Sequence, residues 1–118
     1  MDTSEAPLQF RSSHEFAAWL DTHEDDSAGV WLVVGRKGGA LPVVGYFDAL
    51  LVALAHGWID SMARRIDSQS FLQKFGPRRA KSSWSQRNRD RVLAMLDAGA
   101  LSPRGTAELV RARSDGRW

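Results

Sequence analysis

The chain has 118 residues, 43% hydrophobic and 25% charged, with no cysteine and a formal net charge of +2. This length and balance are typical of a single soluble globular domain, and no apolar run approaches the roughly 20 residues that a transmembrane helix needs. The lack of cysteine excludes disulfides, thiolate catalysis and cysteine-ligated metal centres. Because the first residues are acidic and polar, unlike a signal peptide, we expect a cytoplasmic protein without a membrane span.

The charge is divided unevenly along the sequence. Residues 1–60 contain three basic and nine acidic side chains, whereas residues 61–118 contain thirteen basic and five acidic ones. The interval 64–91 alone carries nine basic residues against two acidic ones. A block of this kind is either an ordinary solvated face or a surface that attracts polyanions.

The chain begins with a polar segment and then shows a helix signal. We expect residues 1–7 to be a disordered N-terminal tail and residues 8–118 to form one domain, opening with a short strand at 8–11. Ser12, with Glu15 three residues later, forms a capping-box pattern that starts a helix reaching about residue 21.

A buried strand and a buried helix follow. The β-branched and aromatic run at 30–34 predicts a strand. The apolar residues of 46–56 have few charges between them, which indicates a mostly buried helix. Gly57 is expected to end that helix in a left-handed conformation.

The next two segments predict a β-hairpin. Residues 58–66 and 71–75 alternate in the manner of strands, and the polar residues 67–70 join them. Pro77 is expected to stop the second strand, because proline has no backbone N–H to donate.

Two helices complete the chain. Ser83 with Gln86, or Ser85 with Asn88, can cap a helix that runs to residue 98, and we expect its apolar residues to face inward, namely Val92, Leu93, Met95 and Leu96. Ser102 and Pro103 open the last helix, which carries Leu109 and Val110. The order (β)αβαββαα favours an α+β fold, with a small antiparallel sheet packed against about four helices.

Several motifs, in this order, resemble a known bacterial family. They are Gly-Trp-Ile-Asp at 57–60, Phe-Gly-Pro-Arg at 75–78, Ser-Ser-Trp-Ser-Gln-Arg-Asn at 82–88 and Asp-Gly-Arg-Trp at 115–118. With them the chain resembles the YdeI/OmpD-associated, or bacteriocin-protection, family. The resemblance covers residues 10–118 and implies a link to antimicrobial-peptide or stress resistance, but it brings no established catalytic residues.

The most informative segment for function is 75–88. It places Arg78, Arg79 and Lys81 directly before a helix start, where unpaired backbone N–H groups also attract anions. Planar guanidinium groups suit phosphate and carboxylate, so we expect an anion site here. The alternative is structural: one of the arginines pairs with Asp60 or with a carbonyl at a helix end and holds the hairpin to the helix.

Other residues join this candidate ligand site by their place in the sequence. Trp58 and Trp84 flank the basic segment, where an exposed indole could stack on a base or sugar ring, although a tryptophan in a small domain is more often part of the core. The remaining members of the candidate site are Asp60, Arg65, Ser82, Ser85 and Asn88. No catalytic residue, cofactor or metal site is assigned, since His14, His23 and His56 lack a metal-ligand spacing.

Three functional classes follow, in this order. The first is a non-enzymatic module whose basic, tryptophan-containing surface binds an anionic or phosphate-containing small molecule. The second is a nucleic-acid-binding protein that uses the 64–91 block. The third is an enzyme acting on a phosphorylated or carboxylated small molecule, with Asp60 as acid/base and Arg78 as electrostatic stabiliser, which requires both groups in one pocket. The sequence leaves the oligomeric state open.

Overall fold

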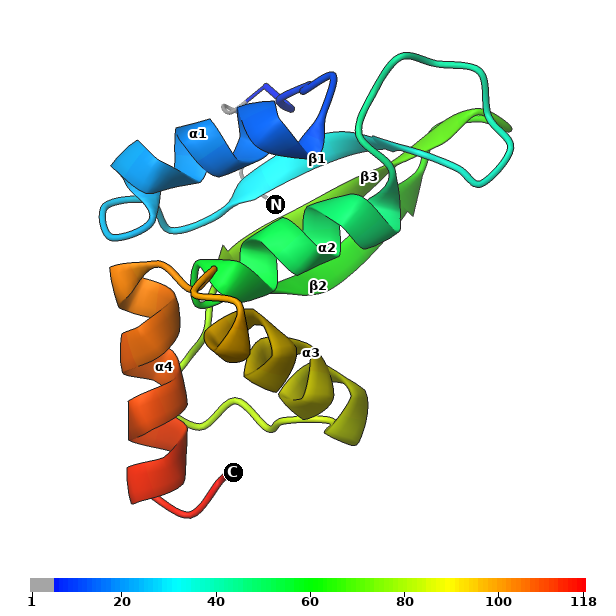
Figure 1. The fold of residues 1–118 in the computed structure, drawn as a ribbon. Coiled ribbons are helices and arrows are strands. Elements are labelled where there is room, and N and C mark those ends of the chain that lie inside the picture. Colours follow the sequence, from blue (N-terminus) through cyan, green and yellow to red (C-terminus); the bar gives the residue numbers. More distant parts are fainter. Residues whose placement is uncertain (1–5) are drawn as a thin grey trace.

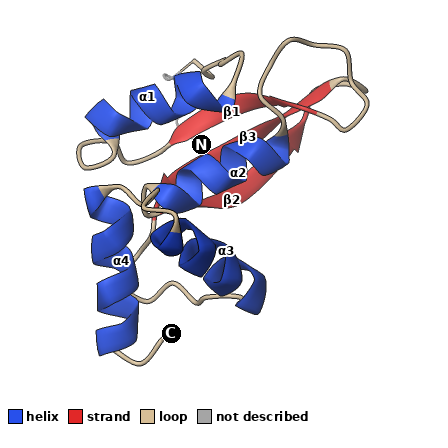
Figure 2. Cartoon of the chain, in the orientation of Figure 1, coloured by secondary structure: helices blue, strands red, loops and turns tan. Residues whose placement is uncertain are grey.

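The computed structural model of the chain describes residues 6–118 as four helices and a small sheet (Figure 1, Figure 2). In chain order the elements are α1 (Ser13–His23), β1 (Val30–Gly35), α2 (Tyr46–Ala55), β2 (Trp58–Arg65), β3 (Ser70–Pro77), α3 (Gln86–Asp97) and α4 (Pro103–Ser114). The predicted α+β class and order are confirmed. Of the predicted tail, residues 1–5 lie outside the described part of the chain. None of these helices is both long and apolar enough to cross a bilayer.

The strands of the described chain form one antiparallel sheet with β3 in the centre, in the order β1-β3-β2. The predicted hairpin is present: the Asp67 carboxylate accepts hydrogen bonds from the backbone N–H groups of Gln69 (2.8 Å) and Ser70 (2.9 Å), which shapes its turn. The strand predicted at 8–11 is reduced to one bridge between Leu8 and Leu32, and Phe10, two residues later, stacks on Phe16 at 5.5 Å between ring centroids.

Helices α1 and α2 lie together over one face of the sheet (Figure 1). The Ser12 hydroxyl accepts from the Glu15 backbone N–H at 3.3 Å, so the predicted cap is present, and α1 continues two residues beyond the predicted end. Gly57 ends the second helix with φ +73°, as expected. A Cβ at this glycine would lie 2.9 Å from the Arg104 carbonyl oxygen, so α4 packs directly on this turn.

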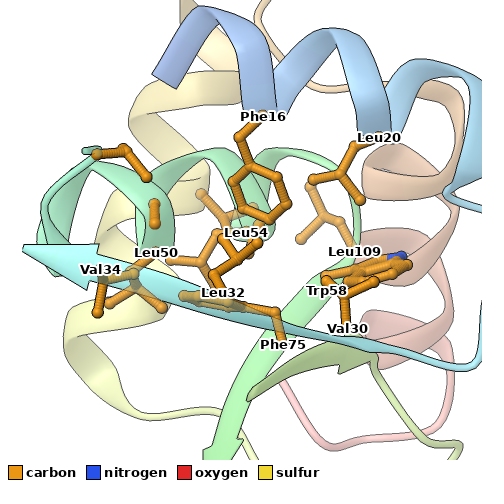
Figure 3. Close-up of a cluster of buried hydrophobic side chains, with 14 residues drawn as sticks. Phe16, Leu20, Val30, Leu32, Val34, Leu50, Leu54, Trp58, Phe75 and Leu109 are labelled. Atoms are coloured by element: carbon orange, nitrogen blue, oxygen red, sulfur yellow. The ribbon is translucent and has the colours of Figure 1, made fainter. Parts of the chain in front are cut away.

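The core lies between this helix layer and the sheet (Figure 3). Phe16 and Leu20 of α1 enter it from above, and Leu32 and Phe75 of the sheet from below, all with fully buried side chains. Phe16 and Phe75 meet at 5.7 Å between ring centroids. This apolar contact across the layers holds the sheet half of the molecule together.

Helices α3 and α4 extend beyond the sheet (Figure 1). In α3 the predicted inward residue Val92 is buried, but Leu93 and Leu96 are 37% and 41% exposed. In α4 Leu109 is buried whereas Val110 is 55% exposed. The prediction that all the apolar residues of α3 face inward was therefore wrong. A helix at the margin of the sheet packs against the rest of the protein along only one narrow stripe of its surface, so its other apolar side chains stay exposed.

Candidate functional site

The segment between β3 and α3 is organised by serine side chains. The Ser82 hydroxyl accepts from the Arg79 backbone N–H at 2.9 Å, and the Ser85 hydroxyl caps α3 by accepting from the Asn88 backbone N–H at 3.1 Å. Of the two capping patterns in the sequence, the helix therefore uses the second. These hydrogen bonds fix the backbone conformation of residues 78–85, the 78–85 loop, between β3 and α3.

Arg78 is buried within this loop and is 4% exposed. Its guanidinium lies 3.5 Å from the centroid of the Trp84 ring and donates to the Ser83 carbonyl at 3.1 Å. Burial lowers the pKa of Arg78 to about 10, an effect that Glu108 opposes and the nearby Arg117 reinforces. The side chain is still protonated at neutral pH, so a buried cation ties the end of the hairpin to the loop. This is a structural role, as the alternative expected, but the acceptor is a loop carbonyl and neither Asp60 nor a carbonyl at a helix end.

The residues after α4 return to this loop. Arg117 donates to the Ser82 carbonyl at 2.8 Å, and the Trp118 ring meets the Trp84 ring edge-on at 5.0 Å. Arg89 of α3 donates to the main-chain oxygen of Trp118. We call this set the arginine–tryptophan junction; its members are Arg78, Trp84, Arg89, Arg117 and Trp118.

Arg79 and Ser82 line a separate surface groove of about 480 Å³ beside β2 and β3. This basic groove brings two cations and two hydroxyls together with apolar side chains. Its principal lining residues are Ile59, Ser61, Met62, Lys74, Arg79 and Ser82. The sequence predicted an anion site in this region, and the groove holds two of the residues it named.

A β-bulge helps to shape the groove. The pairing of β2 with β3 is interrupted between Asp60 and Ala63, so Ser61 and Met62 leave the regular ladder and line the hollow. Buried Gln73 spans the irregularity by donating to the carbonyls of Met62 at 3.0 Å and Lys74 at 3.1 Å. The buried amide of Gln73 therefore stabilises the irregular backbone of β2 at the bulge.

Like most basic side chains of this protein, the two groove cations, Lys74 and Arg79, have no salt-bridge partner within residues 6–118. Arg104, Arg111 and Arg117, in contrast, each pair with a carboxylate. Lys74 instead lies 5.8 Å from the Trp31 ring centroid, over which Arg64 also lies, at 5.2 Å. The groove thus has a positive charge that no described acid neutralises.

Trp58 and Asp60 have other surroundings. Trp58 is fully buried and donates its indole N–H to the Glu24 carbonyl at 3.1 Å, so it belongs to the core. Asp60 accepts from the Tyr46 hydroxyl at 2.5 Å. Burial, together with this hydrogen bond and the Asp60 charge, raises the pKa of Tyr46 to about 12. Neither Asp60 nor Arg78 lines the groove, so the geometry does not favour the enzyme hypothesis.

The remaining predicted residues are spread over the surface. Arg65 lies toward the far end of β2, where it pairs with Phe71. The Asn88 side chain accepts from Arg91 at 2.9 Å, and Lys81 is exposed in the 78–85 loop. Within residues 6–118, no group of three His, Asp or Glu side chains is placed to hold a metal ion. The predicted members therefore do not form one site.

Sequence reasoning missed Ser61, Met62 and Lys74 as lining residues of the groove, and the buried Trp31 as the ring beneath Lys74. Lys74 precedes the buried Phe75, so strand alternation alone places it on the opposite face, and that signal was available. Trp31 meets Lys74 only through the register of β1 with β3. The bulge that brings Ser61 and Met62 into the groove has no clear signature in the sequence.

A comparison with protein families gives one match, to residues 8–108, and its description is "Domain of unknown function (DUF8412)". No curated protein and no solved structure matches the chain. The family match overturns the resemblance to the YdeI/OmpD-associated family, and the resistance role implied by that resemblance is dropped. The motifs that carried the resemblance encode a glycine–proline strand end, a serine cap and a stacked Arg–Trp pair, which are local devices that unrelated chains can share.

Proposed function

The chain belongs to the DUF8412 family, and we propose that it is a binding module that takes the phosphate or carboxylate group of a small molecule in its basic groove. The observation that carries this proposal is that Lys74 and Arg79 line one hollow without a carboxylate partner among residues 6–118. An anion entering the groove would supply the missing countercharge and accept charge-assisted hydrogen bonds.

The shape and lining of the groove indicate an organic anion. The hydroxyls of Ser61 and Ser82 add donors for the oxygens of a phosphate or carboxylate. Ile59 and Met62 add apolar surface, and Met62 is 52% exposed in the free protein. A ligand with an anionic group and an apolar body would use both parts of the lining, in the way that small-molecule sites combine apolar walls with a few polar groups.

The first test is an NMR titration of the backbone amides with inorganic phosphate and with phenyl phosphate. We expect shifts at Ser61, Lys74, Gly76 and Ser82, and tighter binding of phenyl phosphate because its ring can contact Ile59 and Met62. The Lys74→Ala and Arg79→Ala variants should each weaken binding about tenfold, since a hydrogen bond to a charged group contributes roughly 1.5–3 kcal/mol.

Lys81→Ala is the matched control, because Lys81 has the same charge and is exposed in the same loop but is not among the groove's lining residues. Its affinity for phenyl phosphate should equal that of the wild type. The proposal fails if the groove amides do not shift, or if Lys81→Ala weakens binding as much as Lys74→Ala.

The basic residues along β2 and β3 favour nucleic acid as a second candidate. Arg64 and Lys74 both lie over Trp31, which shows that the positive surface continues along the sheet from the groove. Trp31 is only 5% exposed, so it offers no platform for base stacking, and contacts would be made mainly to phosphates. This candidate predicts oligonucleotide binding that weakens steeply with salt and is reduced by Arg64→Ala, a change that leaves phenyl phosphate affinity intact.

A further inference from the structure

The arginine–tryptophan junction contains four buried N–H groups without an acceptor. They are Nη2 of Arg78, Nε1 of Trp84, Nε of Arg89 and Nη2 of Arg117, and none finds a hydrogen-bond partner among residues 6–118. A buried donor left unpaired loses its hydration without compensation. Several such donors at one junction make its closed packing less favourable than that of a fully satisfied interior.

The positive charge at the junction is only partly compensated. Three of its five members are cations, and Arg117 and Arg78 are close enough for each to oppose the other's charge. The acids nearby are already engaged, since Asp115 pairs with Arg117 at 2.8 Å and Glu108 pairs with Arg111. Arg78 donates to the Ser83 carbonyl, and Arg89 donates to the main-chain oxygen of Trp118.

Residues 115–118 close the junction, and we call them the latch. Gly116 has φ +83° and makes the reversal that brings Arg117 and Trp118 back onto the 78–85 loop. The latch is held by Arg117 on the Ser82 carbonyl, by Trp118 against Trp84, and by the Trp118 backbone N–H on the Ala112 carbonyl at 3.1 Å. In this closed arrangement the unpaired donors are buried, so an anion reaches them only when the latch moves.

We propose that the latch covers a second anion site, in which Arg78, Arg89 and the indole N–H of Trp84 bind a tetrahedral oxyanion such as phosphate. Displacing Arg117 and Trp118 uncovers these donors and removes the like charge beside Arg78. The oxyanion then supplies acceptors for the donors that are unpaired in the closed junction. This site is distinct from the basic groove, although Ser82 belongs to the surroundings of both.

The test is a phosphate titration of the 118-residue chain, monitored through the NMR signals of the Trp84 indole N–H and the Arg89 Nε–H. Gly116→Ala changes no side-chain contact, because nothing lies within 4 Å of the added Cβ, but it strains the left-handed turn of the latch. The strain destabilises the closed form and so raises the fraction of molecules in which the latch is open. The phosphate affinity measured at Trp84 should therefore be about tenfold higher in Gly116→Ala than in the wild type.

Gly99→Ala is the matched control. Gly99 also has a positive φ, +68°, with no atom within 4 Å of an added Cβ, but it ends α3 and does not belong to the latch. This variant should keep the phosphate affinity of the wild type at Trp84. In the Gly116→Ala background, Arg89→Gln should abolish the Trp84 response, while the dispersed indole signal of Trp58 reports that the core is intact.

Two results would overturn the inference. If phosphate leaves the Trp84 and Arg89 signals unchanged in both the wild type and Gly116→Ala, the junction is not an anion site. If Gly116→Ala and Gly99→Ala change the affinity equally, the latch does not control access. Phenyl phosphate, titrated in parallel, distinguishes a site for free phosphate from one for the phosphoryl group of a larger ligand. The groove amides of Ser61 and Gly76 report separately, so this test is independent of the first.

Discussion

The packing within the two halves of this molecule depends on different interactions. In the sheet half, residues 8–77, apolar side chains fill the space between the helices and the sheet, and buried polar groups such as the Trp58 indole and the Gln73 amide have partners. In the helical half, residues 78–118, Val92 and Leu109 join this apolar cluster, and stacked arginine and tryptophan side chains add a second set of contacts. Of the six unpaired buried side-chain atoms among the described residues, five belong to this half and one to Glu24.

This difference indicates in which half a ligand could displace the existing side-chain contacts. Apolar packing has no better partner in water, so the sheet half gains nothing by opening. Guanidinium and indole N–H groups do have better partners, namely water and anions. The helical half is therefore the part whose packing a ligand can compete with. The 78–85 loop, with which this half begins, contributes residues to both proposed sites.

The largest expected effect comes from breaking the contact between the halves at Gly105. A Cβ at this position would lie 2.1 Å from the Ala55 carbonyl oxygen, a backbone atom that cannot rotate away. We expect Gly105→Ala to lower the free energy of unfolding by about 3 kcal/mol, which is typical of overpacking and exceeds the roughly 1 kcal/mol gained in helix propensity. Urea unfolding measures the change.

Thr106→Ala is the control for this prediction, since Thr106 is exposed on the same helix. It should change the free energy of unfolding by no more than about 0.5 kcal/mol. Equal stabilities for the two variants would show that α4 does not pack closely on the end of α2.

The second prediction compares two adjacent arginines. Arg78→Ala removes the contact with Trp84 and the hydrogen bond to the Ser83 carbonyl, and we expect it to cost about 2 kcal/mol in urea unfolding. Arg78→Lys should recover only part of this loss, because an ammonium lacks the planar fork that stacks and donates together. Arg79→Ala should cost less than about 0.5 kcal/mol, since Arg79 is exposed.

If Arg79→Ala destabilises the protein as much as Arg78→Ala, the division between a structural arginine and a ligand-facing arginine is wrong. The same pair of variants separates stability from binding, because Arg79→Ala is also expected to weaken phenyl phosphate binding in the groove. The Arg78→Ala and Arg79→Ala variants thus test the structural role of one arginine and the binding role of the next.

The smallest effect concerns pH in the sheet half. Tyr46 is the one tyrosine of the chain, so an ultraviolet absorbance titration follows it alone. Its pKa is raised to about 12 in the folded protein, first by burial and then by Asp60. Because the folded pKa lies above the ordinary value of 10.0, the contribution to stability is complete below pH 10 and is lost as the pH rises toward 12.

Asp60→Asn should lower the midpoint of this titration, since it removes the negative charge beside the phenol while leaving Tyr46 in place. A midpoint unchanged by this substitution would show that the hydrogen bond between Tyr46 and Asp60 does not contribute to the pKa.

Local signals in the sequence predicted much of the fold. Ser12, Gly57, Ser102 and Pro103 mark helix ends, and each acts at that end in the structure. These signals work because a cap or a left-handed glycine satisfies its own backbone within a few residues. Burial on α3 was predicted less well, because the exposure of Leu93 and Leu96 depends on what lies opposite that helix.

For the candidate site, the sequence by itself determined that an unusual concentration of cations lies in 64–91 and that arginine, serine and tryptophan meet before α3. Only the tertiary structure decided which cations are available to a ligand. Arg78 became part of the interior because it stacks on Trp84, whereas Arg79, one residue later, lines the groove where strand pairing has placed Lys74. The physical reason is that charge is a property of a residue, but burial and pairing depend on distant segments that the fold brings together.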